Sequence, residues 1–228
     1  MQYQDLEQSI RKAPPIYTRL GDQGTTQLGS LRLSKHHDRV RLVGQIQWAQ
    51  MCVAELIAYW RIDDLSKSFT GPNQDLDLLL KRKIKNDVDV QLDRLLYGLF
   101  FLGGYVGSDS LTPFYNKEGE DILRRWTAEM EQVIDLIQED TPAPHGFSWA
   151  STTDVLYNRI QHAMCHIRAL ESAIAGEAVL DLTVFSAFFN RASDLLYAIG
   201  VYTQAQIVVD VYYEMSKTSL INYMRGNQ

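Results

Sequence analysis

The residues best suited to chemistry gather near the start of the chain, in the stretch IYTRLGDQGTT. Gly21 and Gly24 allow positive φ and carry no side chains, so backbone N–H groups around them could converge on an anion. Thr25 and Thr26 add hydroxyl donors, while Asp22 could orient a magnesium-bound water or fix the loop through its backbone. The stretch could therefore hold a polyphosphate, although a tight turn with an aspartate cap is the common alternative for such a pattern.

This stretch does not match the usual nucleotide-binding loops. It lacks the lysine of a Walker A motif and does not follow a predicted strand, which excludes a P-loop and a Rossmann fingerprint. The formal net charge of -6 argues against a nucleic-acid surface and against binding to anionic membranes. An anionic ligand would therefore have to be held by local groups.

The rest of the chain shows the periodicity of long helices. Apolar residues recur at helical spacing over five segments, at 40–59, 76–102, 122–137, about 151–174, and from about 180 into the tail. Gly103 and Gly104 are expected to end the second helix, and strand signals are almost absent. Long helices with short connections predict an all-α, up-and-down five-helix bundle.

Length and composition fit one domain. The 228 residues are 46% hydrophobic and 22% charged, which is ordinary for a globular protein with one core. We expect a single domain over 1–228, with an extended nucleotide-binding segment at 1–39 and helices at 40–228. The apolar runs fall short of the roughly 20 residues that span a bilayer. Cys52 and Cys165 are too few for a disulfide framework, which favours the cytoplasm.

Two parts of the sequence resemble a known family. IYTRLGDQGTTQL followed by LSKHHDRV resembles the amino-terminal signature of PduO-type ATP:cob(I)alamin adenosyltransferases, in which IYT-x-x-GD-x-GTT precedes SKDD-x-RV. FFNRASDLLYAIGVY is similar to the family's FLNRLSDYLFVLARY. The resemblance implies a five-helix bundle that assembles as a homotrimer, with ATP and corrinoid bound between subunits. It also implies transfer of the 5′-deoxyadenosyl group from ATP to cob(I)alamin, with release of triphosphate.

The resemblance further implies roles for individual residues. Its ATP-binding positions correspond here to Tyr17, Thr18, Gly21, Asp22, Gly24, Thr25, Thr26, Lys35, Arg168 and Asn190. Phe147 lies where the family places its corrin-facing aromatic, so Phe147 and Arg168 are the candidate catalytic residues. Arg39 and Arg191 fall on patterned positions that fit a structural role, with Asp194 a plausible partner for either. The implied ligands are ATP, Mg²⁺ and cob(I)alamin as substrate, and an adenosylcobalamin-dependent enzyme is a further expected partner.

Two stretches depart from the family pattern. The family's VDELN reads IQWAQ here, which puts Gln47 and Trp48 in place of two acids. The arginine-rich CRRAER, which contacts ATP and pairs with the aspartate, corresponds to CHIRALES, with Arg168 as its one arginine. Loss of both the acid and the arginine of an ion pair leaves no buried charge without a partner. It does, however, remove positive charge that would stabilise the triphosphate leaving group. The alternative function is a catalytically impaired relative that binds ATP or a corrinoid as a sensor, carrier or partner subunit; a purely structural bundle is a third reading.

The remaining histidines are weaker candidates. His162 and His166 lie one helical turn apart in HAMCH and could share a metal, but the sequence offers no clear third ligand. We therefore expect histidines that are satisfied or at the solvent edge, and no metal site. His36 and His37 replace two family acids, and a surface loop is the favoured interpretation for them.

Overall fold

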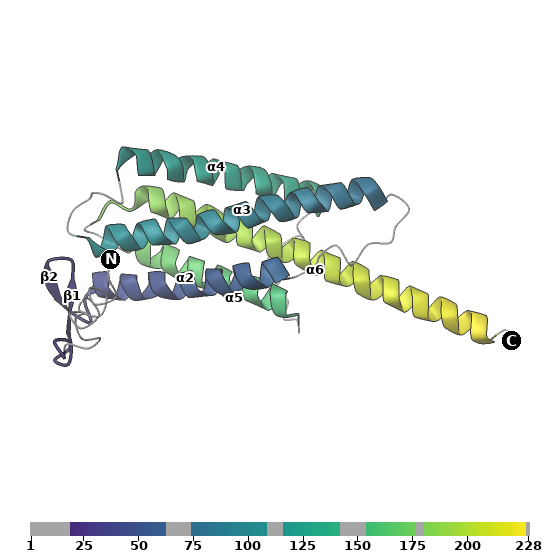
Figure 1. The fold of residues 1–228 in the computed structure, drawn as a ribbon, viewed down its shortest axis with the longest axis horizontal. Helices are drawn as coiled ribbons and strands as arrows, with labels where there is room; N and C mark the ends of the chain where they lie inside the picture. Colours follow the sequence, from purple (N-terminus) through teal and green to yellow (C-terminus); the bar gives the residue numbers. More distant parts are fainter. Residues whose placement is uncertain (1–18, 63–73, 109–115, 142–153, 177–179, 227–228) are drawn as a thin grey trace, which may run out of the picture.

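The structure is a computed structural model that describes residues 19–62, 74–108, 116–141, 154–176 and 180–226. Within these residues the order is β1 (Thr25–Leu28), β2 (Leu31–Ser34), α2 (Asp38–Ile62), α3 (Gln74–Gly107), α4 (Lys117–Asp140), α5 (Val155–Ala175) and α6 (Thr183–Gly226). The chain direction alternates from helix to helix, and α6 extends beyond the others (Figure 1). This arrangement confirms the predicted all-α, up-and-down bundle.

The helices surround one apolar core. The helix α2 packs against α3 and α5, and α6 packs against α4 and α5. Trp60 of α2 and the α6 residues Phe185, Phe188 and Phe189 are fully buried. A Cβ at Gly98 of α3 would lie 2.3 Å from Phe188 Cε1, so only glycine permits this close approach of α3 to α6. Burial of such large side chains contributes about 1.5–3 kcal/mol each and is the main term that holds the bundle together.

The ends of two helices differ from the prediction. The expected end of the second helix at Gly103 and Gly104 is wrong, because α3 continues to Gly107. Tyr105 and Val106 are buried there, and their burial outweighs the cost of about 1 kcal/mol for each helical glycine. The fifth predicted helix begins at Thr183 and not near residue 180, since Asp181 Oδ1 accepts hydrogen bonds from Thr183 N at 3.2 Å and Oγ1 at 2.8 Å.

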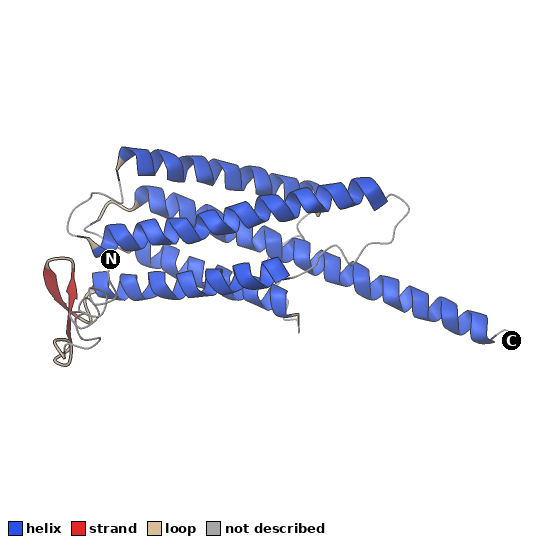
Figure 2. Cartoon of the chain, in the orientation of Figure 1, coloured by secondary structure: helices blue, strands red, loops and turns tan. Residues whose placement is uncertain are grey.

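The β1–β2 hairpin is an element that helical periodicity does not reveal. Thr25 pairs with Ser34 and Leu28 pairs with Leu31 in an antiparallel ladder. Gly29 has φ +60° at the first central position of the connecting turn, which matches the glycine preference of a type II′ hairpin. Figure 2 shows the hairpin outside the bundle, at the end where α2 begins. Among the described helices, none contains a segment long and apolar enough to cross a membrane.

Candidate functional site

The glycine-rich stretch forms two successive turns in front of the hairpin. Asp22 N donates to Arg19 O at 3.2 Å, and Gly24 N donates to Gly21 O at 3.2 Å. Gly24 has φ +77°, a conformation that favours glycine, and its carbonyl accepts a hydrogen bond from Lys35 N at 2.9 Å. The turns are therefore folded back against the end of β2, which brings Lys35 beside them.

The side chain of Lys35 lies over the first of these turns. A Cβ on Gly21 would lie 3.5 Å from Lys35 Nζ and 3.3 Å from Thr25 O, so glycine leaves the room that the ammonium group occupies. Asp22 and Lys35 are exposed and Thr25 is half-buried. The predicted ATP-binding residues that this turn brings together are Gly21, Asp22, Gly24, Thr25, Thr26 and Lys35. This segment supplies a cation, one carboxylate and two hydroxyls, which are groups that can bind phosphate, and the side chains of Thr25 and Thr26 project to opposite faces of the hairpin because they are neighbours on β1.

Three predicted site residues fall outside the described residues. They are Tyr17 and Thr18 before the turn, and Phe147 between α4 and α5. Their roles stay predictions.

The two histidines that follow the hairpin belong to the start of α2. His37 Nδ1 accepts a hydrogen bond from Arg39 N at 3.2 Å, and His37 O accepts from Val40 N at 2.9 Å and Arg41 N at 3.0 Å. His36 is exposed on the turn between β2 and α2. His37 thus acts as a helix cap, as expected for a surface turn.

Arg39 and Arg191 make different structural contacts. Arg39 Nε donates to Val106 O at 2.6 Å and Arg39 Nη2 donates to Ser108 O, which ties the start of α2 to the end of α3. Arg191 Nη1 donates to Asp194 Oδ2 at 2.8 Å, and its Nε donates to Glu131 Oε1 of α4 at 3.0 Å. Asp194 is therefore the partner of Arg191, while Arg39 binds backbone carbonyls at the hairpin end of the bundle.

Asn190 lies in a second candidate region, an open groove of about 540 Å³ between the end of α5 and the start of α6. Its Nδ2 donates to Glu171 Oε1 at 2.9 Å, and Asp181 and Thr183 also line the groove. The hydrogen bonds from Thr183 lower the pKa of Asp181, so this carboxylate is ionised at neutral pH. The volume suits a small molecule, but the two carboxylates make the groove acidic. A polyphosphate bound here would need cations from elsewhere.

Arg168 lies on the groove side of α5. It precedes Glu171 by three residues, which places the two about 60° apart around the helix. Arg168 is half-buried. The helical register therefore puts Arg168, Glu171 and Asn190 along one side of the α5–α6 pair.

A second hollow lies on the side of α5 that faces away from this groove. This hollow of about 300 Å³ is lined by Asp38 and Arg41 at the start of α2 and by Ala173 and Gly176 at the end of α5. At about 100° per residue, Ala173 and Gly176 lie roughly opposite Glu171 on the helix. The start of α2, which follows the hairpin in the chain, thus borders the side of α5 that faces away from Asn190.

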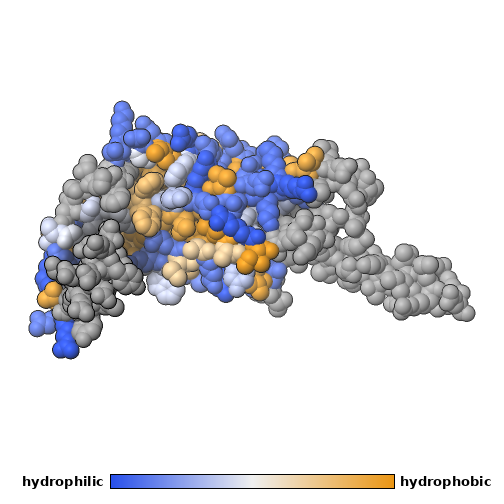
Figure 3. All heavy atoms as spheres, in the orientation of Figure 1, coloured by the Kyte–Doolittle hydropathy of each residue, from blue (hydrophilic) through white to orange (hydrophobic). Residues whose placement is uncertain are grey.

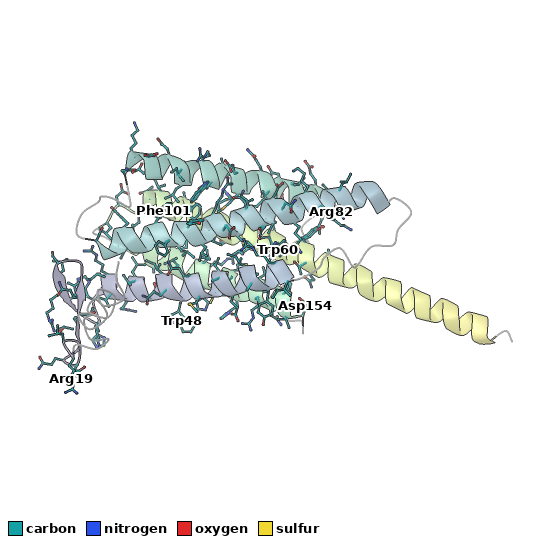
Figure 4. The ribbon with its side chains drawn as sticks, in the orientation of Figure 1. Arg19, Trp48, Trp60, Arg82, Phe101 and Asp154 are labelled. Carbon is teal, nitrogen blue, oxygen red and sulfur yellow. The ribbon has the colours of Figure 1, made fainter. Side chains whose placement is uncertain are left out.

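The face between α2 and α5 has an unusual composition. Trp48, one of the two residues in place of the family's acids, stacks on His166 with ring centroids 5.6 Å apart and planes 4° apart. Trp48 lies on the outer edge of α2 (Figure 4). Burial lowers the pKa of His166, and the charge of His162 lowers it further. An uncharged aromatic stack therefore stands where the resemblance leads one to expect an acid and an arginine.

Cys52 joins the same face. One potential ligand atom from each of Cys52, His162 and His166 lies within 4.8 Å of the others. Burial raises the pKa of the Cys52 thiol, the charge of Glu55 adds to this, and Arg159 opposes it. Cys52 was not predicted as a ligand from the sequence. Its only sequence signal is its position one helical turn after Trp48, and the sequence does not show which helix packs against this one.

The family profile of cobalamin adenosyltransferases matches residues 16–203, and the chain belongs to this family. Three solved structures share its fold, each a variant of the PduO-type ATP:corrinoid adenosyltransferase from Lactobacillus reuteri. Two of these, complexed with cobalamin and ATP, are 21% identical with TM-scores of 0.60 and 0.61, and the match covers 84% of this chain and 94% and 92% of theirs. The third, complexed with ATP, is 20% identical with a TM-score of 0.60, over 84% of this chain and 95% of that one. No curated protein matches the sequence.

Proposed function

We propose that this protein transfers the 5′-deoxyadenosyl group of ATP to cob(I)alamin. The observation that carries the proposal is the position of the Lys35 ammonium over the Gly21 turn, in a chain whose family profile describes this activity. In the reaction the cobalt(I) electron pair attacks the 5′ carbon and forms the cobalt–carbon bond. The bond from that carbon to oxygen breaks, and triphosphate leaves with the bonding electrons.

The turn is suited to the leaving triphosphate. In this proposal the Lys35 ammonium and the hydroxyl of Thr25 stabilise negative charge as it develops. The exposed Asp22 carboxylate, three residues before Thr25 in the chain, fits Mg²⁺, which proteins commonly hold through one or two carboxylates together with substrate phosphates. Bound Mg²⁺ would neutralise charge on the leaving group. In this proposal Tyr17 and Thr18 complete the phosphate site and Phe147 faces the corrin.

We propose that the complete ATP site forms between subunits of a homotrimer. The start of α2, just after the hairpin, and the groove with Asn190 border opposite sides of α5. In this proposal the turn of one subunit meets the acidic groove of the next. Charge supports this pairing, because the groove carries Glu171 and Asp181 while the turn supplies Lys35. The two cysteines are unpaired, which supports our expectation of a reducing compartment, the cytoplasm.

Exposed apolar side chains on α2 and α3 support the proposed interface between subunits. They include Met51, Tyr59 and Ile62 of α2, and Leu79, Val90 and Tyr97 of α3. Figure 3 shows apolar side chains gathered over the middle of the face where α2 and α3 lie. Contiguous exposed apolar surface of this kind marks interaction sites. Sedimentation equilibrium should report a mass of three chains, and a monomer at micromolar concentration contradicts the interface.

Two observations favour the second candidate, a relative that binds ATP or a corrinoid with impaired catalysis. The Trp48–His166 stack supplies no charge to the proposed ATP site. The side-chain amide of Asn190 already donates a hydrogen bond to Glu171. Loss of one well-placed donor to a developing anion can cost about 3 kcal/mol in the barrier. Arg168 is the cation that remains in this stretch of α5.

One experiment separates the two candidates. Hydroxocobalamin is reduced to cob(I)alamin under anaerobic conditions, protein and Mg-ATP are added, and the absorption spectrum of adenosylcobalamin is followed. Turnover that falls in Lys35→Ala supports the transferase. Calorimetric binding of Mg-ATP without turnover supports the impaired relative, and no binding of either ligand overturns both.

A further inference from the structure

We propose that the α2–α5 face binds one zinc ion through Cys52, His162 and His166. The three side chains come from two adjacent helices, and one potential ligand atom from each lies within 4.8 Å of the other two. This soft donor set of one thiolate and two imidazoles is the kind that zinc prefers over hard cations such as Mg²⁺. The site is separate from the proposed nucleotide turn and does not depend on the proposed reaction.

The spacing of the two histidines fits a shared metal. They stand at positions i and i+4 of α5, so both project from one side of the helix. Their Nε2 atoms lie 3.2 Å apart. With zinc–nitrogen bonds of about 2.0–2.1 Å, two imidazole ligands of a tetrahedral ion are separated by about 3.3 Å. A metal between these atoms would replace the hydrogen bond that two neutral imidazoles can form at this distance.

The surroundings favour the orientation that ligation needs. The stack of Trp48 on His166 fixes the plane of this imidazole, with centroids 5.6 Å apart. Outer-shell contacts that orient a metal-binding histidine commonly strengthen binding. Burial of Cys52 keeps bulk water from the sulfur side of the site.

Three protein ligands leave a fourth coordination position. Glu55 lies near Cys52, but its carboxylate is engaged by Arg159 Nη1 at 2.9 Å. His162 is exposed, so the fourth position is open to water or to a small ligand. Three protein ligands and one open position are the pattern of catalytic zinc sites, whereas structural sites have four protein ligands.

The test uses full-length protein treated with a chelator and kept reduced without added thiols. Co²⁺ is titrated first, because a cobalt–thiolate bond gives charge-transfer absorption in the near ultraviolet. Zn²⁺ is then measured by competition with a chromophoric chelator. We expect one Co²⁺ per chain with the thiolate band, displacement by Zn²⁺, and a Tm that rises with Zn²⁺.

Matched variants identify the ligands. Loss of an outer-shell partner alone commonly weakens a metal site 10–100-fold, so Cys52→Ser should weaken zinc binding about 100-fold or more and abolish the thiolate band. Cys165→Ser, the other free cysteine, and His36→Ala should leave both unchanged. His162→Asn changes an exposed residue, so it tests the site even if substitution of the buried Cys52 prevents folding. Zinc affinity that is unchanged in His162→Asn, or a thiolate band that disappears in Cys165→Ser, overturns the proposal.

Discussion

The hairpin turn and the α2–α5 face differ in charge and in the geometry that they require. The turn, Gly21–Lys35, contains no buried residue, keeps the pattern GD-x-GTT and carries a lysine over a glycine. The α2–α5 face, formed by Trp48, Cys52, His162 and His166, has an aromatic stack where the resemblance predicts opposite charges, with the Cys52 thiol beside it. Both members of an ion pair can be replaced together without leaving a buried charge unpaired. A turn that needs positive φ cannot be altered so easily, because most side chains are strained there.

The largest effect expected from this comparison concerns Arg39, which joins the turn's end of α2 to α3. Arg39→Ala removes charged hydrogen bonds to Val106 O and Ser108 O and leaves these carbonyls without that donor. We expect the free energy of unfolding to fall by about 2–3 kcal/mol. Chemical denaturation followed by circular dichroism measures this change.

Arg41→Ala is the matched control for Arg39. Its ion pair with Asp38 is long, at 3.6 Å, and the two side chains are 69% and 87% exposed. Such a pair is worth at most about 0.5 kcal/mol. If Arg39→Ala is as stable as this control but loses ATP binding, Arg39 belongs to the nucleotide site and its structural assignment is wrong.

The second prediction tests the charge of the turn. Lys35→Ala should weaken Mg-ATP binding about 10–30-fold, since a charged hydrogen bond to phosphate is worth roughly 1.5–2 kcal/mol. Because the Lys35 side chain is exposed, the Tm should stay nearly constant. Isothermal titration calorimetry gives the affinity.

Lys83→Ala provides the control for Lys35. Lys83 lies on α3 and pairs with Asp87 at 3.1 Å, with 60% of its side chain exposed. Its removal lowers the net charge equally but changes no residue of the turn. Equal losses of affinity in the two variants would show that only the overall charge matters, and the local site would be refuted.

The third prediction tests the backbone of the turn with two glycines that have open space around them. Gly24 has φ +77° and Gly44 lies within α2, and a Cβ at either would meet nothing within 4 Å. Gly24→Ala should cost about 1 kcal/mol of strain and lower ATP affinity about 5-fold. Gly44→Ala should raise the free energy of unfolding by about 0.5–1 kcal/mol and leave ATP affinity unchanged. ATP affinity equal to wild type in Gly24→Ala would separate the turn from nucleotide binding.

How much the sequence predicts differs between these regions for a physical reason. The helices follow from local apolar spacing, and the residues of the turn lie close together in the chain, so both could be predicted. The contact of Arg39 with Val106 spans 67 residues, and the approach of Cys52 to His162 and His166 depends on which helices pack together. Helical spacing shows which face is buried but not which helix covers it. The early end predicted for α3 failed because tertiary packing at Tyr105 and Val106 overrides the weak helix propensity of glycine.

The smallest expected effect concerns the stack on the α2–α5 face. An aromatic pair adds about 0.5–1.5 kcal/mol, and because Trp48 is 63% exposed we expect Trp48→Ala to cost only about 0.5 kcal/mol in the free energy of unfolding. Phe100→Ala, which removes an aromatic ring that is 66% exposed on α3, is the control for loss of apolar surface. If the free energy of unfolding falls by more than this, denaturation at several protein concentrations shows whether the lost contacts lie within one chain or between subunits. A cost near 2 kcal/mol that grows with protein concentration would mean that a neighbouring subunit buries Trp48, because only an association equilibrium depends on concentration. In that case the α2–α5 face would be part of the subunit interface, and its replaced charges would reflect contact between subunits and not a change in the nucleotide site.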